Sequence, residues 1–194
     1  MKIYFVRHGE AVDDVENKYG GWYDPDLSPK GLKSGEEIGK KLKEKGLGAE
    51  VILTSPLKRA YQTAQQINKF FNLPIESFVY LKERNTYGLL CGENKAEAKE
   101  KYPDLVKAYE NDQPVHGYEP YDMFLTRVKE MVNKLCLLNY KSVICVTHGK
   151  LLKALANDVM NKKASEFGDN CVLEVNLDSE GNLEYINSEG IIFN

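Results

Sequence analysis

Arginine, histidine and cysteine are scarce in this sequence, and their scarcity limits the chemistry that the chain can perform. Only four of the 26 basic residues are arginines, so lysine is the cation wherever charge alone is needed. An arginine in this chain therefore indicates a geometry that a lysine ammonium cannot supply. The four cysteines show no CxxC or other metal-like spacing, which argues against disulfides and against a cysteine-based zinc site.

An excess of positive charge and long apolar runs are also missing. The net charge is −3, the pI is near 5.7 and no basic stripe occurs, which argues against nucleic acid or an anionic membrane as a partner. No apolar run approaches the roughly 18 residues of a membrane span, and the chain begins with an expected strand. We therefore expect a cytoplasmic protein that folds as one domain over residues 1–194.

Short apolar strands alternate with amphipathic helices along most of the chain. Buried strands are expected at residues 2–6, 51–53 and 142–146. Helices are expected at residues 29–47, 57–71, 94–109 with a break at Pro103, 121–138 and 151–160. This alternation predicts an α/β fold, a three-layer α/β/α sandwich with a mostly parallel sheet. Two alternating segments, 171–177 and 183–186, predict a C-terminal hairpin.

Two of the expected helices follow a serine–proline pair. Ser28 with Pro29, and Ser55 with Pro56, each fit an N-cap followed by proline in the first helical turn. Arg59 would then lie in the first turn of the second of these helices, where free backbone N–H groups already favour an anion.

Cationic and imidazole side chains follow the ends of the expected strands. The first strand ends at Arg7 and His8, the strand 142–146 is followed by His148, and Arg59 comes shortly after the strand 51–53. In an open α/β sheet the carboxyl ends of parallel strands form the edge at which ligands bind. We therefore expect these four side chains to converge on one site.

Such a cluster suits a tetrahedral, dianionic phosphoryl group. Guanidinium groups match phosphate oxygens bidentately, and a neutral imidazole is a competent nucleophile. Cationic neighbours disfavour the imidazolium form, so a histidine here should stay neutral near pH 7. A leaving alkoxide needs a proton, and Glu83, in a loop that ends at Gly88, is the best-placed carboxylic acid.

Other chemistries lack their residues. Two histidines without a carboxylate at ligand spacing fall short of a zinc site, and arginines in the same pocket would repel a cation. Neither a GxSxG elbow nor a GxxxxGK[ST] loop occurs. We therefore expect no metal and no cofactor.

Four segments together resemble the histidine phosphatase superfamily, whose fold is phosphoglycerate-mutase-like. The segments are Val6-Arg7-His8-Gly9-Glu10, Thr54-Ser55-Pro56-Leu57-Lys58-Arg59-Ala60-Tyr61-Gln62-Thr63-Ala64, Leu81-Lys82-Glu83-Arg84 with Tyr87-Gly88, and Val146-Thr147-His148-Gly149. They occur in the family's order and span nearly the whole chain. As a set they are highly specific, whereas each one alone would be weak.

The resemblance implies a role for each residue of the cluster. His8 would be the nucleophile that becomes phosphohistidine, and Glu83 would be the proton donor. Arg7, Arg59 and His148 would bind the phosphoryl group. The resemblance also implies a small-molecule phosphate ester as substrate and no metal, and it leaves open whether the protein is a monomer or a dimer.

Additional substrate contacts would come from two loops. In the loop Asn17 to Trp22 the candidates are Asn17, Gly20 and Gly21. Arg84 follows the proton donor and could either form a structural ion pair or reach a substrate carboxylate. Relatives often have an asparagine that touches phosphate where Asp14 falls here, so the role of Asp14 stays open. His116, in a proline- and glycine-containing loop, is expected to face solvent.

Within the superfamily two activities compete. The chain resembles the phosphoglycerate mutases around residues 21–28 and 83–97, but those enzymes are longer and carry an insertion with paired arginines. Residues 99–118 contain no arginine here, and a mutase needs additional cations to retain its phosphorylated intermediate. We therefore expect a phosphomonoester hydrolase of the small phosphatase branch. The alternatives are a mutase, a bifunctional mutase/phosphatase and, with little support, a non-catalytic phospholigand-binding protein.

Overall fold

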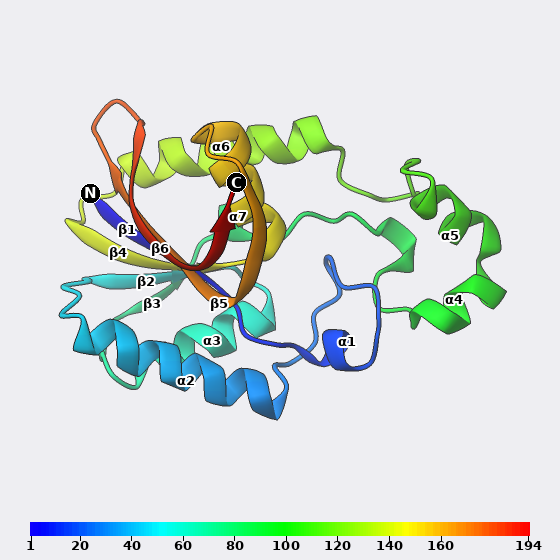
Figure 1. Cartoon of the computed structure of the whole chain (residues 1–194), viewed down its shortest axis with the longest axis horizontal. Helices are drawn as coiled ribbons and strands as arrows, with labels where there is room; N and C mark the ends of the chain where they lie inside the picture. Colours follow the sequence, from blue (N-terminus) through cyan, green and yellow to red (C-terminus); the bar gives the residue numbers. More distant parts are fainter.

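The computed structural model describes residues 1–194 and contains one six-stranded sheet in the order β3-β2-β4-β1-β5-β6 (Figure 1). Strands β3, β2, β4 and β1 run parallel, whereas β5 pairs antiparallel with both β1 and β6. The strands are β1 (Lys2–Arg7), β2 (Val51–Thr54), β3 (Ile75–Ser77), β4 (Ser142–Thr147), β5 (Ala164–Leu177) and β6 (Leu183–Phe193). The predicted α/β fold with a mostly parallel sheet and a C-terminal hairpin is confirmed.

Helices cover both faces of the sheet. Figure 1 shows α2 and α3 on one face and α6 and α7 on the other, while α4 and α5 extend away from the sheet. The helices are α1 (Val12–Val15), α2 (Pro29–Glu44), α3 (Lys58–Asn68), α4 (Lys95–Lys101), α5 (Pro103–Glu110), α6 (Tyr121–Cys136) and α7 (Gly149–Ala154). Short 3-10 turns occur at Val79–Leu81 and Gly88–Leu90, and α7 continues into a π-helical turn at Leu155–Val159. No helix is long and apolar enough to cross a membrane.

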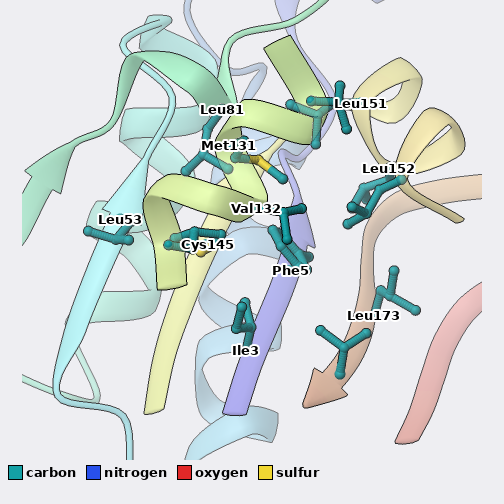
Figure 2. Packing of buried hydrophobic residues seen from close by; sticks show 14 of the residues in the cluster. Ile3, Phe5, Leu53, Leu81, Met131, Val132, Cys145, Leu151, Leu152 and Leu173 are labelled. Carbon is teal, nitrogen blue, oxygen red and sulfur yellow. The ribbon is translucent and has the colours of Figure 1, made fainter. Parts of the chain in front are cut away.

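The central strands are buried on both faces, which explains why they read as unbroken apolar runs. Successive side chains of β1 point to opposite faces, so Ile3 and Phe5 pack under α6 and α7 while Tyr4 and Val6 face α2 and α3. Figure 2 shows the larger of these two clusters, in which Met131 of α6 lies among the strand residues. Packing on both sides holds β1 and β4 firmly, and with them the residues at their carboxyl ends.

The two serine–proline pairs behave differently. Ser28 caps α2 as predicted, since its hydroxyl accepts a hydrogen bond from the Gly31 N–H at 3.0 Å and Pro29 occupies the first helical position. The prediction that Ser55 caps α3 is wrong, because the helix begins at Lys58 and Leu57 is its N-cap. The Ser55 hydroxyl instead contacts the His148 ring.

The C-terminal hairpin is longer than the sequence indicates. Both strands extend well beyond the alternating segments, and their added length includes register shifts between Phe167 and Val172. Most of the added residues, such as Ser165, Glu166 and Asp169, are exposed, so they lack the alternation of polar and apolar side chains that predicts a strand.

A close backbone contact fixes α2 against the segment that follows β1. A Cβ added to Gly31 would lie 2.0 Å from the Glu10 carbonyl oxygen, and one added to Gly9 would lie 2.7 Å from the Gly31 carbonyl oxygen. Glycine at both positions therefore lets the start of α2 approach the residue directly after His8.

Substitution of Gly31 tests this contact. We expect Gly31→Ala to lower the free energy of unfolding by about 2–3 kcal/mol, because the new methyl group would overlap backbone that cannot move independently. Urea-induced unfolding measures the difference. Gly48→Ala is the matched control, since nothing lies within 4 Å of its added Cβ. Equal stability of the two variants would contradict the proposed constraint.

Candidate active site

The predicted cluster lies at the carboxyl ends of the parallel strands, around a cavity of about 310 Å³. Arg7, His8, Arg59 and Glu83 line the cavity. His148 does not line it but lies directly behind His8, with ring centroids 4.9 Å apart and the rings edge to face. The structure thus brings together the five residues predicted as catalytic, four on the cavity wall and one behind it.

The partners of His8 determine which ring nitrogen is free of a proton. Its Nδ1 lies 2.7 Å from the Gly9 carbonyl oxygen, which can only accept a hydrogen bond, so Nδ1 carries the proton. Its Nε2 lies 3.2 Å from Arg59 Nε, which can only donate, so Nε2 keeps its lone pair. Burial, together with the guanidinium groups of Arg59 and Arg7, holds the pKa of His8 well below 6.5. His8 is therefore neutral, with Nε2 available as a nucleophile.

Arg59 holds its position through all three of its guanidinium nitrogens. Besides the Nε contact with His8, Nη1 donates to the Tyr23 carbonyl at 2.8 Å and Nη2 to the Gly21 carbonyl at 2.9 Å. Gly21 has a φ of 66°, which favours glycine, and this conformation belongs to the loop whose carbonyls accept from Arg59. A lysine could not make these three contacts.

His148 is completely buried and is held by Ser55, whose hydroxyl lies 2.7 Å from its Nε2. Its Nδ1 is buried and has no hydrogen-bond partner in the protein. Burial, and then Arg59 and the neighbouring His8, lower the pKa of His148 well below 6.5. No sequence pattern indicates the Ser55 contact, because the two residues are 93 positions apart.

Strand β5 holds Arg7 from the other side of the cavity. Nη1 of Arg7 donates to the Phe167 carbonyl at 2.5 Å, and Nη2 forms an ion pair with Asp169 at 3.1 Å. The Arg7 Nε is buried without a partner, and Gly149 packs against this part of the side chain. Sequence reasoning missed Phe167 and Asp169, which lie in the part of β5 that shows no strand pattern.

The Glu83 carboxylate is oriented by two backbone N–H groups. Oε1 accepts from the Arg84 N–H at 2.8 Å and Oε2 from the Lys150 N–H at 3.3 Å. Trp22 donates its indole N–H to the Glu83 carbonyl at 2.7 Å. Glu83 is buried except for 8% of its surface, and it lines the cavity together with His8. Its carboxyl group therefore faces the same space as the nucleophile.

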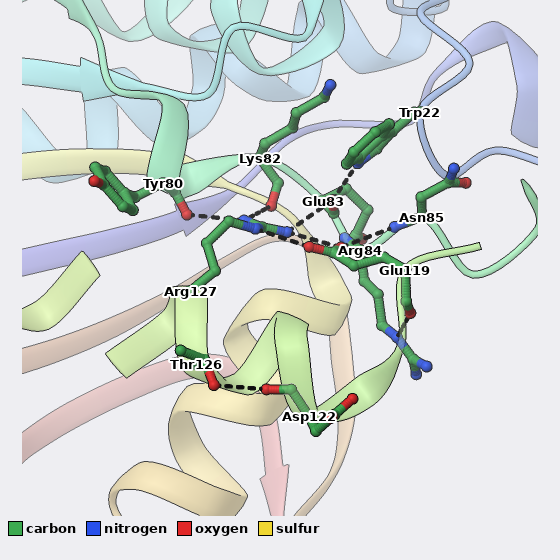
Figure 3. A network of polar contacts seen from close by, with 10 residues as sticks. All are labelled: Trp22, Tyr80, Lys82, Glu83, Arg84, Asn85, Glu119, Asp122, Thr126 and Arg127. Carbon is green, nitrogen blue, oxygen red and sulfur yellow. Dashed lines mark hydrogen bonds and ion pairs between the residues drawn. The ribbon is translucent and has the colours of Figure 1, made fainter. Parts of the chain in front are cut away.

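Arg127 clamps the segment that carries Glu83, as Figure 3 shows. Its guanidinium donates to the carbonyls of Tyr80, Lys82 and Glu83 at 2.8–3.2 Å. It also pairs with the Glu119 carboxylate through two contacts of 3.0 Å each. The scarcity of arginine pointed to a geometric role for this residue, but the sequence did not identify its partners.

Of the remaining predicted contacts, the structure brings some to the cavity and not others. Gly20 and Gly21 line it. Asn17 is exposed and does not line it, and its carbonyl accepts from the Lys95 N–H at 3.0 Å. Arg84 lines a neighbouring cavity instead. Asp14 lines the active-site cavity, and its carboxylate accepts from the Ala11 N–H at 3.1 Å.

Further cavity residues were not singled out from the sequence as site residues. They are Asp13, Lys18, Tyr87, Lys95, Gly149, Lys150, Lys153 and Phe167. Together with the two arginines, the lysines make six cations against the three carboxylates of Asp13, Asp14 and Glu83. The cavity is therefore suited to an anion. Nowhere in the chain do three His, Cys, Asp or Glu side chains come together as a metal site would require.

The sequence profile of the histidine phosphatase superfamily (branch 1) matches residues 3–183, nearly the whole chain. The chain belongs to the histidine phosphatase superfamily. The matched region includes Arg7, the last residue of β1, and the neutral, buried His8 that follows it.

Solved structures of other superfamily members share the fold. The α-ribazole phosphatase of Shigella flexneri superposes with a TM-score of 0.81 at 19% identity, covering 96% of this chain and 95% of that one. The phosphoglycerate mutase of Bacillus anthracis gives 0.78 at 21% identity, covering 98% and 92%. A mycobacterial glucosyl-3-phosphoglycerate phosphatase gives 0.75 at 20% identity, covering 97% and 95%. At these identities the likeness shows the fold and leaves the reaction open, since both phosphatases and a mutase are among the matches.

The two buried histidines should make the stability depend on pH. Because burial lowers the pKa of His8 and His148, the unfolded chain binds more protons than the folded one below about pH 6.5. Acid therefore favours the unfolded state. Each histidine should remove up to about 1.4 kcal/mol of stability at pH 5.5 and nothing at pH 7.5.

Urea unfolding of the wild type and of His148→Gln at both pH values tests this expectation. The glutamine variant should lose less stability on acidification than the wild type, because its unfolded chain has one imidazole fewer that can bind a proton. His116→Gln, which changes an exposed histidine, is the matched control. Equal losses in the wild type and His148→Gln would contradict a depressed pKa.

Proposed function

We propose that the protein is a phosphomonoester hydrolase that forms a phosphohistidine intermediate on His8. The observation that carries this proposal is the state of His8, which is buried and neutral, with its proton on Nδ1 and its Nε2 lone pair beside Arg59. An imidazole in this state is a nucleophile at neutral pH, and the guanidinium next to it can hold the phosphoryl group that it attacks.

In the first step, His8 Nε2 attacks the phosphorus atom, a P–N bond forms and the P–O bond to the alcohol breaks. Arg7 and Arg59 stabilise the charge on the phosphoryl oxygens. We assign His148 Nδ1, which is buried beside His8 without a partner in the protein, to donate a hydrogen bond to one of these oxygens once the phosphoryl group is on His8. Glu83 delivers its proton to the departing oxygen, so the product leaves as a neutral alcohol.

In the second step, water attacks the phosphohistidine. Glu83, now ionised, accepts a proton from that water, the P–N bond breaks and inorganic phosphate leaves with the new P–O bond. The lone pair returns to His8 Nε2. No metal or cofactor takes part in either step, and the substrate is a small-molecule phosphate ester.

The small number of cations that segment 95–118 contributes to the cavity favours a phosphatase over a mutase. A mutase must retain a phosphorylated intermediate while it reorients, and it needs additional charged contacts for this. The segment 95–118 contributes one cation to the cavity, Lys95, and no arginine. The six cations of the whole cavity nevertheless keep a mutase or a bifunctional enzyme as the second candidate.

A panel of phosphomonoesters, assayed with EDTA present, separates these candidates. We expect phosphate release from several esters in chelator and no rapid conversion of 3- to 2-phosphoglycerate in a coupled assay. Rapid isomerisation with little phosphate release would make the protein a mutase. A loss of activity in EDTA that is restored by a metal would overturn the metal-independent mechanism.

Two substitutions test the assigned roles. His8→Ala should abolish both the acid-labile phosphoenzyme and turnover, because no other imidazole lines the cavity. Glu83→Gln should slow hydrolysis of alkyl phosphates by about 100-fold or more and that of p-nitrophenyl phosphate far less, since nitrophenolate leaves without a proton. Phosphate release under initial-rate conditions measures both. Equal losses on the two ester types would remove Glu83 from the role of acid.

A further inference from the structure

A second cavity, of about 370 Å³, adjoins the active-site cavity and has Lys150 and Lys153 of α7 in common with it. Arg84, Tyr121, Phe124 and Asp158 are among its other lining residues. The two spaces therefore meet along the first turns of α7. A substrate whose phosphoryl group lies at His8 can extend past these lysines into the second cavity.

Arg84 has guanidinium N–H groups without hydrogen-bond partners in this second cavity. Its Nε donates to the Glu119 carbonyl at 3.1 Å, but neither terminal nitrogen makes a hydrogen bond within the protein. The guanidinium carbon lies 5.0 Å from the centre of the Tyr121 ring, which supports the planar group without occupying its donors. Arg84 forms no ion pair, so the structural ion pair considered from the sequence is absent.

Neither Lys150 nor Lys153 forms an ion pair within the protein, and the acidic group that acts on Lys150 is the Glu83 carboxylate of the same cavity. Lys150 is half-buried and its Nζ lies 5.7 Å from the centre of the Tyr87 ring, and burial lowers the pKa of its ammonium group. Lys153 is exposed and lies three residues further along the same helix, so both side chains are on one face of α7. A half-buried cation without a counterion is stabilised when an anion binds beside it.

These cations lie on the side of the cavity from which the alcohol leaves. The Lys150 N–H holds the Glu83 carboxylate, and Arg84 is the next residue after Glu83. Because Glu83 would protonate the leaving oxygen, whatever that oxygen is attached to lies next to Lys150 and Arg84. The cations therefore face the alcohol part of the ester.

The opposite side of the active-site cavity is less favourable to a second anion. There α1 contributes the carboxylates of Asp13 and Asp14, and Lys18 is paired with Glu16 at 2.6 Å. The second cavity has one carboxylate, Asp158, which accepts the Tyr121 hydroxyl at 2.5 Å. On the side of α1 the one cation without an ion pair is Lys95, next to Asn17, whereas Arg84, Lys150 and Lys153 lie together around α7. The cations without ion pairs are thus more numerous around α7.

We infer that Arg84, Lys150 and Lys153 form a second anion-binding subsite, and that the substrate is a phosphate ester whose alcohol part carries another anionic group, a carboxylate or a second phosphate. This inference rests on the proposed phosphatase function and specifies its substrate class. The phosphoryl group to be transferred binds at Arg7 and Arg59, and the second anion binds across the two cavities.

Matched ester pairs test the subsite. The carboxylate pair is 3-phosphoglycerate and glycerol 3-phosphate, and the phosphate pair is propane-1,3-diol bisphosphate and 3-hydroxypropyl phosphate. We expect kcat/KM to favour the acidic member of at least one pair by about tenfold or more, the effect of one charge-assisted contact. The pair that shows the preference identifies the anion. Equal kcat/KM within both pairs would overturn the inference.

Substitutions then assign the preference to α7. Lys150→Met should reduce kcat/KM for the preferred acidic ester about tenfold more than for its neutral partner, and exposed Lys153→Met about threefold more. Lys129→Met on α6 is the matched control, because Lys129 is exposed and unpaired and lines neither cavity. If kcat/KM fell equally for both esters in the two α7 variants, these lysines would not bind the second anion.

Failure of the subsite can be distinguished from failure of the enzyme. If p-nitrophenyl phosphate is hydrolysed through a His8 phosphoenzyme but the acidic esters gain nothing, the subsite alone is wrong. If no ester is hydrolysed, the phosphatase function is wrong. Calorimetric binding of the same pairs to His8→Ala still decides the subsite in that case, since tighter binding of the acidic member supports it and equal binding overturns it.

Discussion

Burial of the His8 imidazole against Arg59 is the constraint on which the site depends. An exposed histidine would be partly protonated near neutral pH, and a protonated ring has no lone pair with which to attack phosphorus. Burial and the adjacent guanidinium disfavour the protonated ring, and the Gly9 carbonyl keeps the remaining proton on Nδ1. The same Arg59, which adds to the effect of burial on the His8 pKa, is held by hydrogen bonds to two loop carbonyls.

The charge distribution around His8 favours one orientation of a phosphate ester in the cavity. In the proposed mechanism the phosphoryl group faces the two arginines and the alcohol faces Glu83. The position of Glu83 depends on the contacts that Arg127 makes with Glu119 and with the Glu83 carbonyl. Beyond Glu83 the unpaired lysines of α7 continue the positive surface into a second cavity. The proposed chemistry is thus assigned to the edge of the sheet, and the proposed substrate selection to residues of α7 and the loop after β3.

Predictions from the sequence succeeded where burial on both sides of a strand left an unambiguous pattern. The strands that end near His8 and His148 are such runs, and parallel strands bring their carboxyl ends to one edge. Where a segment is exposed, or a side chain has two possible partners, the sequence was not sufficient to predict the strand or the contact. The extended start of β5 shows no alternation. The Ser55 hydroxyl lies 2.7 Å from the His148 ring and accepts from the Leu57 N–H at 3.3 Å, but Ser55 lies two residues before the N-cap of α3.

The α/β fold and the positions of Arg7, His8, Arg59 and His148 could be predicted from the amino-acid sequence, because strand patterns and motif positions are local properties of the chain. How those residues are held, and what surrounds them, depends on tertiary contacts. The proton position on His8, the anchoring of Arg7 by β5 and the pairing of cavities along α7 all join residues that are distant in sequence. Contacts of this kind arise from packing, and no local pattern records them.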